Sequence, residues 1–180
     1  GGPAGGIIVA NDGEIAQALD TIAFPGMTAN FDAAKTAALA VTMLDWRDFG
    51  AAYAAEMIAL SQALAAALDG AGVPEFAGAA GFTNSHQFAV KAEAYGGGQA
   101  ASKPLRKNGF HACGIGLPVA PVAGDMNGLR IGTPDLVRWG MTAGDADRLA
   151  DLITRGLSDD GVMAEVSDWR RTFSRLCFVH

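Results

Sequence analysis

The chain has 180 residues, of which 50% are hydrophobic and 18% charged, and its formal net charge at pH 7 is −6. This size suits one domain, or a small domain with an extension, and the negative charge argues against a nucleic-acid partner. The two cysteines, Cys113 and Cys177, show neither disulfide nor zinc spacing, and no apolar run approaches the roughly 20 residues that span a membrane, so we expect a cytoplasmic protein without metal or membrane.

Two elements are predicted in the first thirty residues. Residues 6–11 form a short apolar run before an Asn-Asp-Gly turn, which indicates a buried strand. Residues 14–23 have apolar side chains at helical spacing, and Asp12 is placed to cap this helix. Residues 24–26, Phe-Pro-Gly, should end it. Because the sequence opens on Gly-Gly-Pro without a methionine, we expect one piece of a longer polypeptide or a processed product.

Residues 31–68 are rich in alanine and carry large apolar residues on a broadly continuous face. This pattern predicts one long helix, or two helices with a bend near Gly50. The glycines and proline of residues 70–74 end it.

Strands and helices alternate after this break, which predicts an α/β domain. Residues 85–91 alternate polar and apolar side chains like a half-buried strand. Three glycines at 96–98 open a helix to about residue 107, and residues 110–117 and 128–131 are two further strands.

Two helices are predicted at the end of the sequence. Thr142 and Asp145 have the spacing of a capping box, and the helix after them buries Ala146, Leu149, Ile153 and Leu157. Residues 162–180 are expected to form an amphipathic helix with Trp169, Phe173 and Leu176 on its buried side.

Most polar residues give little chemical signal. His86 is best interpreted as a packed, hydrogen-bonded strand residue, with substrate contact as the weaker alternative, and His111 has an equally weak claim. Cys113 is expected to be a small buried strand residue, since nothing beside it in sequence would lower the pKa of its thiol. The glycines at 5–6 and 96–98 suit tight turns, because neither belongs to a nucleotide-binding motif.

Arg130 carries most of the functional interpretation. It lies in a short strand-like run that ends in Gly-Thr-Pro. A guanidinium offers a planar fork of donors that matches a carboxylate, and here neighbouring apolar residues would hold it in place. The alternative is an arginine whose stem packs at a strand edge while its head pairs with a surface acid.

Four motifs together resemble serine hydroxymethyltransferase, a pyridoxal-phosphate enzyme family. They are Gly-Pro-Ala-Gly-Gly-Ile at 2–7, Phe-Pro-Gly at 24–26, Arg-Ile-Gly-Thr-Pro at 130–134 and Arg-Trp-Gly-Met at 138–141, in the family's order and spacing. Over roughly its first 155 residues the chain resembles the C-terminal part of these enzymes. The resemblance implies the C-terminal portion of a fold type I enzyme: the end of the large cofactor-binding domain at 1–30, a connecting helix at 31–70 and a small α/β domain at 71–180.

The resemblance also implies the site residues. Arg130 matches the family's carboxylate-binding arginine. The backbone amides of Ala29 and Asn30 fall where a Gly-Gly pair reaches the cofactor phosphate of the neighbouring subunit, although both glycines are replaced here. No catalytic residue is expected in this chain, because none of its lysines stands in the Thr-His-Lys setting of the Schiff-base lysine. Residues 113–115 replace an Asn-Lys-Asn segment near the folate pocket, which favours folate-free relatives.

The implied function is to make or break the Cα–Cβ bond of a β-hydroxy amino acid of the serine, α-methylserine or threonine type. The implied cofactor is pyridoxal 5'-phosphate, with the use of tetrahydrofolate left open. Partners would be the lysine-bearing N-terminal half of the same enzyme, a second copy in a dimer or tetramer, and a small amino acid. The alternatives are a folate-independent threonine transaldolase and a non-catalytic subunit without the lysine.

Overall fold

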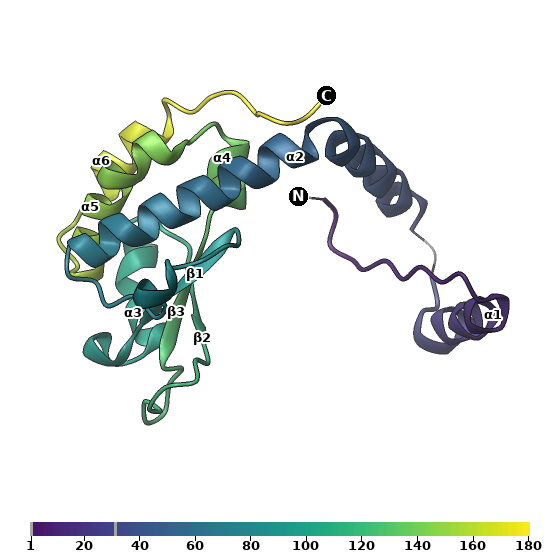
Figure 1. Cartoon of the computed structure of the whole chain (residues 1–180), viewed down its shortest axis with the longest axis horizontal. Coiled ribbons are helices and arrows are strands. Elements are labelled where there is room, and N and C mark those ends of the chain that lie inside the picture. Colours follow the sequence, from purple (N-terminus) through teal and green to yellow (C-terminus); the bar gives the residue numbers. More distant parts are fainter. Residues whose placement is uncertain (1, 31) are drawn as a thin grey trace. The chain divides into compact units, whose positions relative to one another are not determined.

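A computed structural model describes residues 2–30 and 32–180, and these form two compact units, Gly1–Asp48 and Phe49–His180. Both are drawn in Figure 1. The boundary between the units falls within the helix that we expected to connect two domains, and the boundaries expected at residues 30 and 70 stay a prediction.

The first unit contains the predicted capped helix. Helix α1 spans Gly13–Thr21, and the carboxylate of Asp12 accepts hydrogen bonds from the backbone amides of Glu14 and Ile15 at 2.9 and 3.0 Å. A wider turn, Ile22–Met27, follows, and Phe24 within it is extended (φ −144°, ψ 128°) before a cis bond to Pro25. The helix start and its end before Phe-Pro-Gly are therefore confirmed.

The buried strand predicted at residues 6–11 is wrong. None of these residues is in a strand in the described part of the chain, and Ile7, Ile8 and Val9 are 64%, 75% and 85% exposed. A short apolar run becomes a strand only where another strand pairs with it. The described residues of this unit provide no such strand, so the run lies open to solvent.

Helix α2 spans Ala33–Gly70 and runs through Gly50 without interruption. The predicted start at residue 31 lies outside the described residues. An 18-residue window of this helix has a mean hydropathy of 1.4, so α2 is long and apolar enough to cross a membrane, whereas we expected no apolar run of that length. The core helix of a globular domain passes the same test, and Leu60, Leu64 and Leu68 of α2 are fully buried within the second unit.

The second unit is built on a small antiparallel sheet. Among the described residues it contains β1 (Gln87–Lys91), β2 (Cys113–Ile115) and β3 (Gly128–Gly132), in the order β1-β3-β2. Figure 1 shows these strands close to the blue second half of α2. All three strands were predicted, although β2 is shorter than the expected 110–117.

The pleat of the sheet separates an inner face from an outer face. Residues directly opposite one another on paired strands share a face, and the next residue along each strand points the other way. Val90 and Leu129 are such a pair on the inner face, and both are fully buried. Ala89, Arg130 and Cys113 form the corresponding row on the outer face.

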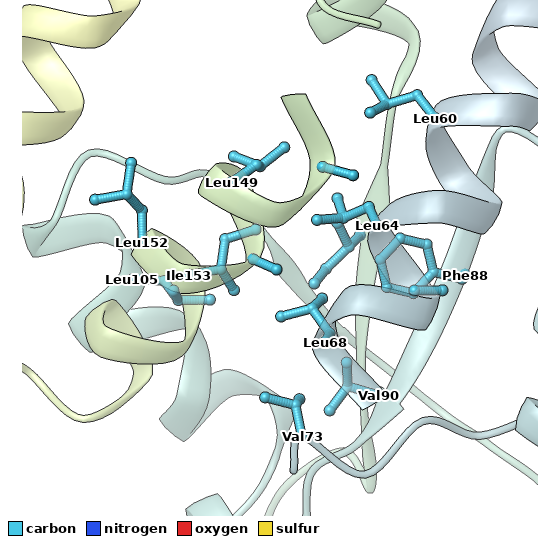
Figure 2. Packing of buried hydrophobic residues seen from close by; sticks show 14 of the residues in the cluster. Leu60, Leu64, Leu68, Val73, Phe88, Val90, Leu105, Leu149, Leu152 and Ile153 are labelled. Atoms are coloured by element: carbon cyan, nitrogen blue, oxygen red, sulfur yellow. The ribbon is translucent and has the colours of Figure 1, made fainter. Parts of the chain in front are cut away.

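Helices cover the inner face and form the core. Helix α3 spans Gly98–Lys107 and α5 spans Ala146–Leu157. Figure 2 shows Leu149 and Ile153 of α5 on the side of the α2 leucines, with Phe88 and Val90 close to Leu64 and Leu68. The predicted capping box is present, because Thr142 and Asp145 bond to each other's backbone, and the four residues expected on the inner side of α5 are all buried.

The glycine run at 96–98 is a tight turn, as predicted. The backbone amides at the start of α3, which follows it, already bind a side chain of the protein. The carboxylate of Asp125 accepts hydrogen bonds from the amides of Gln99 and Ala100 at 3.0 and 2.8 Å. The bond from Gln99 is the main reason that the pKa of Asp125 lies below its usual value. A Cβ atom at Gly98 would collide with the carbonyl oxygen of Gly128, so only glycine fits where α3 meets β3.

Two short helices complete the second unit. Helix α4 (Pro134–Arg138) follows β3 directly and was not predicted as a helix, and α6 spans Met163–Arg170. Single 3-10 turns lie at Gly78–Ala80, Glu93–Tyr95 and Ala143–Asp145. The helix predicted through residue 180 is wrong beyond Arg170: Trp169 is buried as expected, but Leu176 is 46% exposed.

Candidate functional site

A cavity of about 430 Å³ lies on the outer face of the sheet. Its walls come from the start of β1, from β2 and the residues before it, and from the end of β3 with the start of α4. The lining residues are His86, Gln87, His111, Ala112, Cys113, Arg130, Gly132, Pro134 and Asp135. The cavity thus brings together segments far apart in the sequence.

Arg130 projects from the central strand into this cavity. Its cross-strand neighbours Ala89 and Cys113 are small, and Gly132, the next residue of β3 on the same face, carries no side chain. Arg130 is exposed and, among the described residues, has no ion pair or hydrogen bond to its guanidinium. Asp135 lines the same cavity without pairing to it. Arg130 is therefore not paired with a surface acid among the described residues, contrary to the alternative considered from the sequence.

Thr133 holds the rim of the cavity in place. It is fully buried, and its hydroxyl donates to the carbonyl oxygen of Met57 in α2 at 2.8 Å. Its amide donates to the carbonyl of His86 at 2.9 Å, which ties the end of β3 to the residue before β1. The hydroxyl of Tyr53 donates to the carbonyl of Pro134 at 2.9 Å. Helix α2 therefore supports the segment that follows Arg130.

Arg138, from the second arginine motif, has a different environment. Its guanidinium stacks on the ring of Tyr53, 4.4 Å from the centroid. It also donates to the carbonyl of Phe178 at 2.6 Å, and its own carbonyl accepts from the amide of Cys177 at 2.8 Å. Arg138 thus attaches the end of the chain to α2 and α4 and is not available to a ligand.

Two interpretations based on sequence, those of His86 and Cys113, need correction. His86 is exposed in the cavity wall, with Nδ1 3.3 Å from the hydroxyl of Ser85, and is not packed as we expected. His111 lies in the same wall. Cys113 is exposed, not buried, because β2 pairs with β3 on one side only and Cys113 points to the outer face. The sequence does not show which residues of β2 and β3 lie opposite each other, and this register places Cys113 on the outer face.

Ala29 and Asn30 belong to the first unit. Both residues are exposed, and their backbone amides have no acceptor among the described residues. Free backbone N–H groups in an exposed bend are suitable donors for a phosphate. These residues fit the expected role, which the structure leaves as a prediction.

In the described part of the chain, the lysines and acidic residues lie apart from a common site. Lys35, Lys91, Lys103 and Lys107 are exposed, and none of them lines the cavity around Arg130. Among residues 2–30 and 32–180 no group of three or more His, Cys, Asp or Glu side chains could hold a metal ion. What this cavity can do is bind an anion with Arg130 and offer the two imidazoles to the rest of a ligand.

The chain is similar to several known enzymes. No protein-family model matches it. It is 54% identical over 99% of its length to proteins named alpha-methylserine aldolase from Ralstonia sp and Variovorax paradoxus, of which it covers 42% and 41%. It is 33% identical over 96% of its length to the serine hydroxymethyltransferase of Pyrobaculum arsenaticum, of which it covers 41%.

A solved structure has the same fold. The L-threonine transaldolase of Pseudomonas fluorescens superposes with a TM-score of 0.80 over 95% of this chain, at 20% identity, and the chain covers 40% of that protein. The chain therefore spans less than half the length of the relatives that it matches.

Proposed function

Because the sequence and fold of this chain are those of the C-terminal part of a serine hydroxymethyltransferase-like, pyridoxal-phosphate-dependent enzyme of fold type I, we propose that it supplies the substrate-carboxylate site of such an enzyme. The complete enzyme makes or breaks the Cα–Cβ bond of a β-hydroxy amino acid. The observation that carries this proposal is Arg130, an unpaired guanidinium on a central strand in an open cavity.

Arg130 acts by orienting the substrate. Two N–H groups of its guanidinium donate to the two carboxylate oxygens, a geometry that fixes both the position and the rotation of the amino acid. Bound pyridoxal phosphate supplies an electron sink for the pair released when a bond to the α carbon breaks. By fixing the carboxylate, Arg130 decides which bond at the α carbon is aligned for cleavage.

The groups that bind the cofactor lie outside the cavity around Arg130. The amides of Ala29 and Asn30 are free to donate to the cofactor phosphate, as the resemblance implies. The Schiff-base lysine must lie in the part of the enzyme that this chain does not cover, because no described lysine reaches the cavity. The resulting division of labour places carboxylate binding here and covalent cofactor attachment in the other part.

An α-methylserine-type substrate is the proposal best supported by the relatives, since the 54% identical proteins are named for that activity. Residues 113–115 replace the Asn-Lys-Asn segment near the folate pocket, and this favours cleavage without tetrahydrofolate. The fold shared with L-threonine transaldolase supports a second candidate, transfer between threonine and an aldehyde. A non-catalytic subunit is the third candidate, and an active complete enzyme would eliminate it.

The partners are also part of the proposal. The first unit and the first half of α2 expose many large apolar side chains, namely Ile7, Ile8, Val9, Ile15, Ile22, Phe24, Met27, Val41, Met43 and Leu44. So much exposed apolar surface supports a covering partner, which we take to be the rest of the enzyme and a second copy in a cytoplasmic dimer or tetramer. Measuring the intact mass and the oligomeric state in solution tests this.

The experiment for the function uses the complete enzyme and compares Arg130→Ala with the wild type. α-Methylserine, serine and threonine are supplied without tetrahydrofolate, and aldehyde release is followed. Loss of a charge-assisted contact of this kind costs about 2 to 5 kcal/mol, so kcat/KM should fall more than tenfold while cofactor absorbance is kept. Arg106→Ala, at an exposed position of α3, is the control and should retain full activity. Equal activity of the Arg130 variant and the wild type would reject the assignment.

A further inference from the structure

Glu75 is a buried carboxyl group at the junction between α2 and the sheet. It is only 6% exposed, and its Oε1 atom has no hydrogen-bond partner. No ion pair of the described residues involves it. A buried carboxyl without a partner is costly when it is charged, so its presence calls for an explanation.

Residues 74–76 extend the sheet beyond β1. The amide of Lys91 donates to the carbonyl of Pro74 at 2.8 Å, and the amide of Phe76 donates to the carbonyl of Ala89 at 2.9 Å. Glu75 lies directly opposite Val90, which is fully buried on the inner face. Because opposite residues share a face, the Glu75 side chain points toward the core.

The surroundings of Glu75 favour its neutral form. Two titratable groups interact electrostatically with Glu75, namely Asp69 in the last turn of α2 and Tyr95 in the turn Glu93–Tyr95, while β1 presents the apolar Val90 opposite it. Burial first, and then the charge of Asp69, raises the pKa of Glu75 from 4.5 to about 8. Burial, and then the charge of Glu75, also raises the pKa of Tyr95.

We propose that Glu75 makes residues 74–76 a pH-sensitive latch: the segment stays paired with β1 through its backbone hydrogen bonds while the carboxyl is protonated, and ionisation of the carboxyl favours its release into water. Released, Glu75 reaches water, and β1 loses the two backbone hydrogen bonds on its outer edge. The start of β1 contributes Gln87 to the cavity wall, so the release loosens the side of the cavity next to Arg130. This device goes beyond the proposed function and does not depend on it.

The direction of the effect follows from proton linkage. The closed state binds a proton up to a pKa of about 8, whereas the open state releases it near the ordinary value of 4.5. Between these values the ratio of open to closed molecules therefore rises with pH, by at most about tenfold per pH unit. Below and above this window the ratio is constant. Opening thus becomes easier as the solution turns from acidic to mildly alkaline.

Hydrogen exchange of the complete holoenzyme, followed by mass spectrometry from pH 6 to 9, tests the latch. At each pH the exchange rates of peptides covering residues 71–77 and 86–92 are divided by those of Glu75→Gln, which keeps the shape but cannot ionise. This ratio cancels the intrinsic pH dependence of exchange. We expect the ratio to rise with pH and to level off near pH 8. Peptides of α1, which belongs to the first unit, should give a constant ratio.

Asp69→Asn is the second variant, and it remains informative if Glu75→Gln fails to fold. Removing the charge of Asp69 lowers the pKa of Glu75, so the rise in exchange should end at a lower pH than in the wild type. The latch is ruled out by a ratio that does not change with pH, by an equal rise in the peptides of α1, or by an Asp69→Asn profile identical to that of the wild type.

Discussion

The sheet around Arg130 and the chain end around Arg138 show two uses of the same side chain. Arg130 has small cross-strand neighbours, and among the described residues its guanidinium has no ion pair or hydrogen bond, whereas Arg138 stacks on Tyr53 and donates to the carbonyl of Phe178. Both arginines belong to motifs that predicted the family, yet only one of them is free for a ligand. A binding arginine therefore differs from a structural one less in its motif than in whether other protein groups already occupy the N–H donors of its guanidinium.

The largest effect on stability is expected from Arg138→Ala. This change removes the stacking on Tyr53 and the charged hydrogen bond to Phe178, which together contribute about 2 to 4 kcal/mol. We expect a clear drop in the thermal melting temperature of the complete enzyme and faster proteolysis after residue 170. Arg106→Ala is a matched control on an exposed helix. An unchanged melting temperature for Arg138→Ala would show that the chain end is not held by this side chain.

Thr133→Val should have the next largest effect. The substitution keeps the shape but removes the hydroxyl that donates to the Met57 carbonyl, so this buried carbonyl loses one hydrogen bond. The expected loss is about 1 to 3 kcal/mol, measured by denaturant unfolding. Thr133→Ser retains the hydroxyl and should restore most of the loss. If serine and valine destabilise equally, the hydroxyl is not the reason.

Cys113 tests how much room the cavity needs. Leucine at this position would fill the space beside Arg130, and we expect substrate binding to weaken by about 1 kcal/mol, or several-fold in KM. Cys113→Ser is nearly the same size and should bind substrate normally. Equal KM values for the leucine and serine variants would mean that the substrate does not approach β2.

The smallest effect on stability is expected at Arg130 itself. Since its guanidinium has no partner in the part of the chain that the structure describes, Arg130→Ala should change the free energy of unfolding by less than about 0.5 kcal/mol. Denaturant unfolding beside Arg138→Ala gives the comparison directly. A loss as large as that of Arg138→Ala would reveal a structural role for Arg130.

Local sequence signals predicted much of the fold. Asp12 and the Thr142–Asp145 pair act within a few residues of the helices that they cap, and the alternation in β1 follows from one buried face. The failures arose where distant residues decide. The run at 6–11 needed a neighbouring strand, and the residues beyond Arg170 follow distant contacts instead of a helix, since Phe178 stacks on Tyr53 and the Cys177 amide donates to the Arg138 carbonyl.

The candidate site was predictable only in part. Arg130 was found because its motif is local and chemically specific. His86, His111 and the exposed thiol of Cys113 could not be assigned, because their place in one cavity depends on which residue of one strand lies opposite which residue of the next. The sequence around Glu75 did not indicate that this residue is buried, because its burial depends on its pairing with Val90 of β1.

The most direct measurement of the central claim compares the binding of an amino acid with that of its amide. Calorimetric titration of the complete enzyme with α-methylserine and with α-methylserinamide varies only the carboxylate. We predict that the wild type binds the acid at least tenfold more tightly, or by about 1.4 kcal/mol, and that Arg130→Ala loses this preference. A preference for the acid that survives in Arg130→Ala would contradict the account.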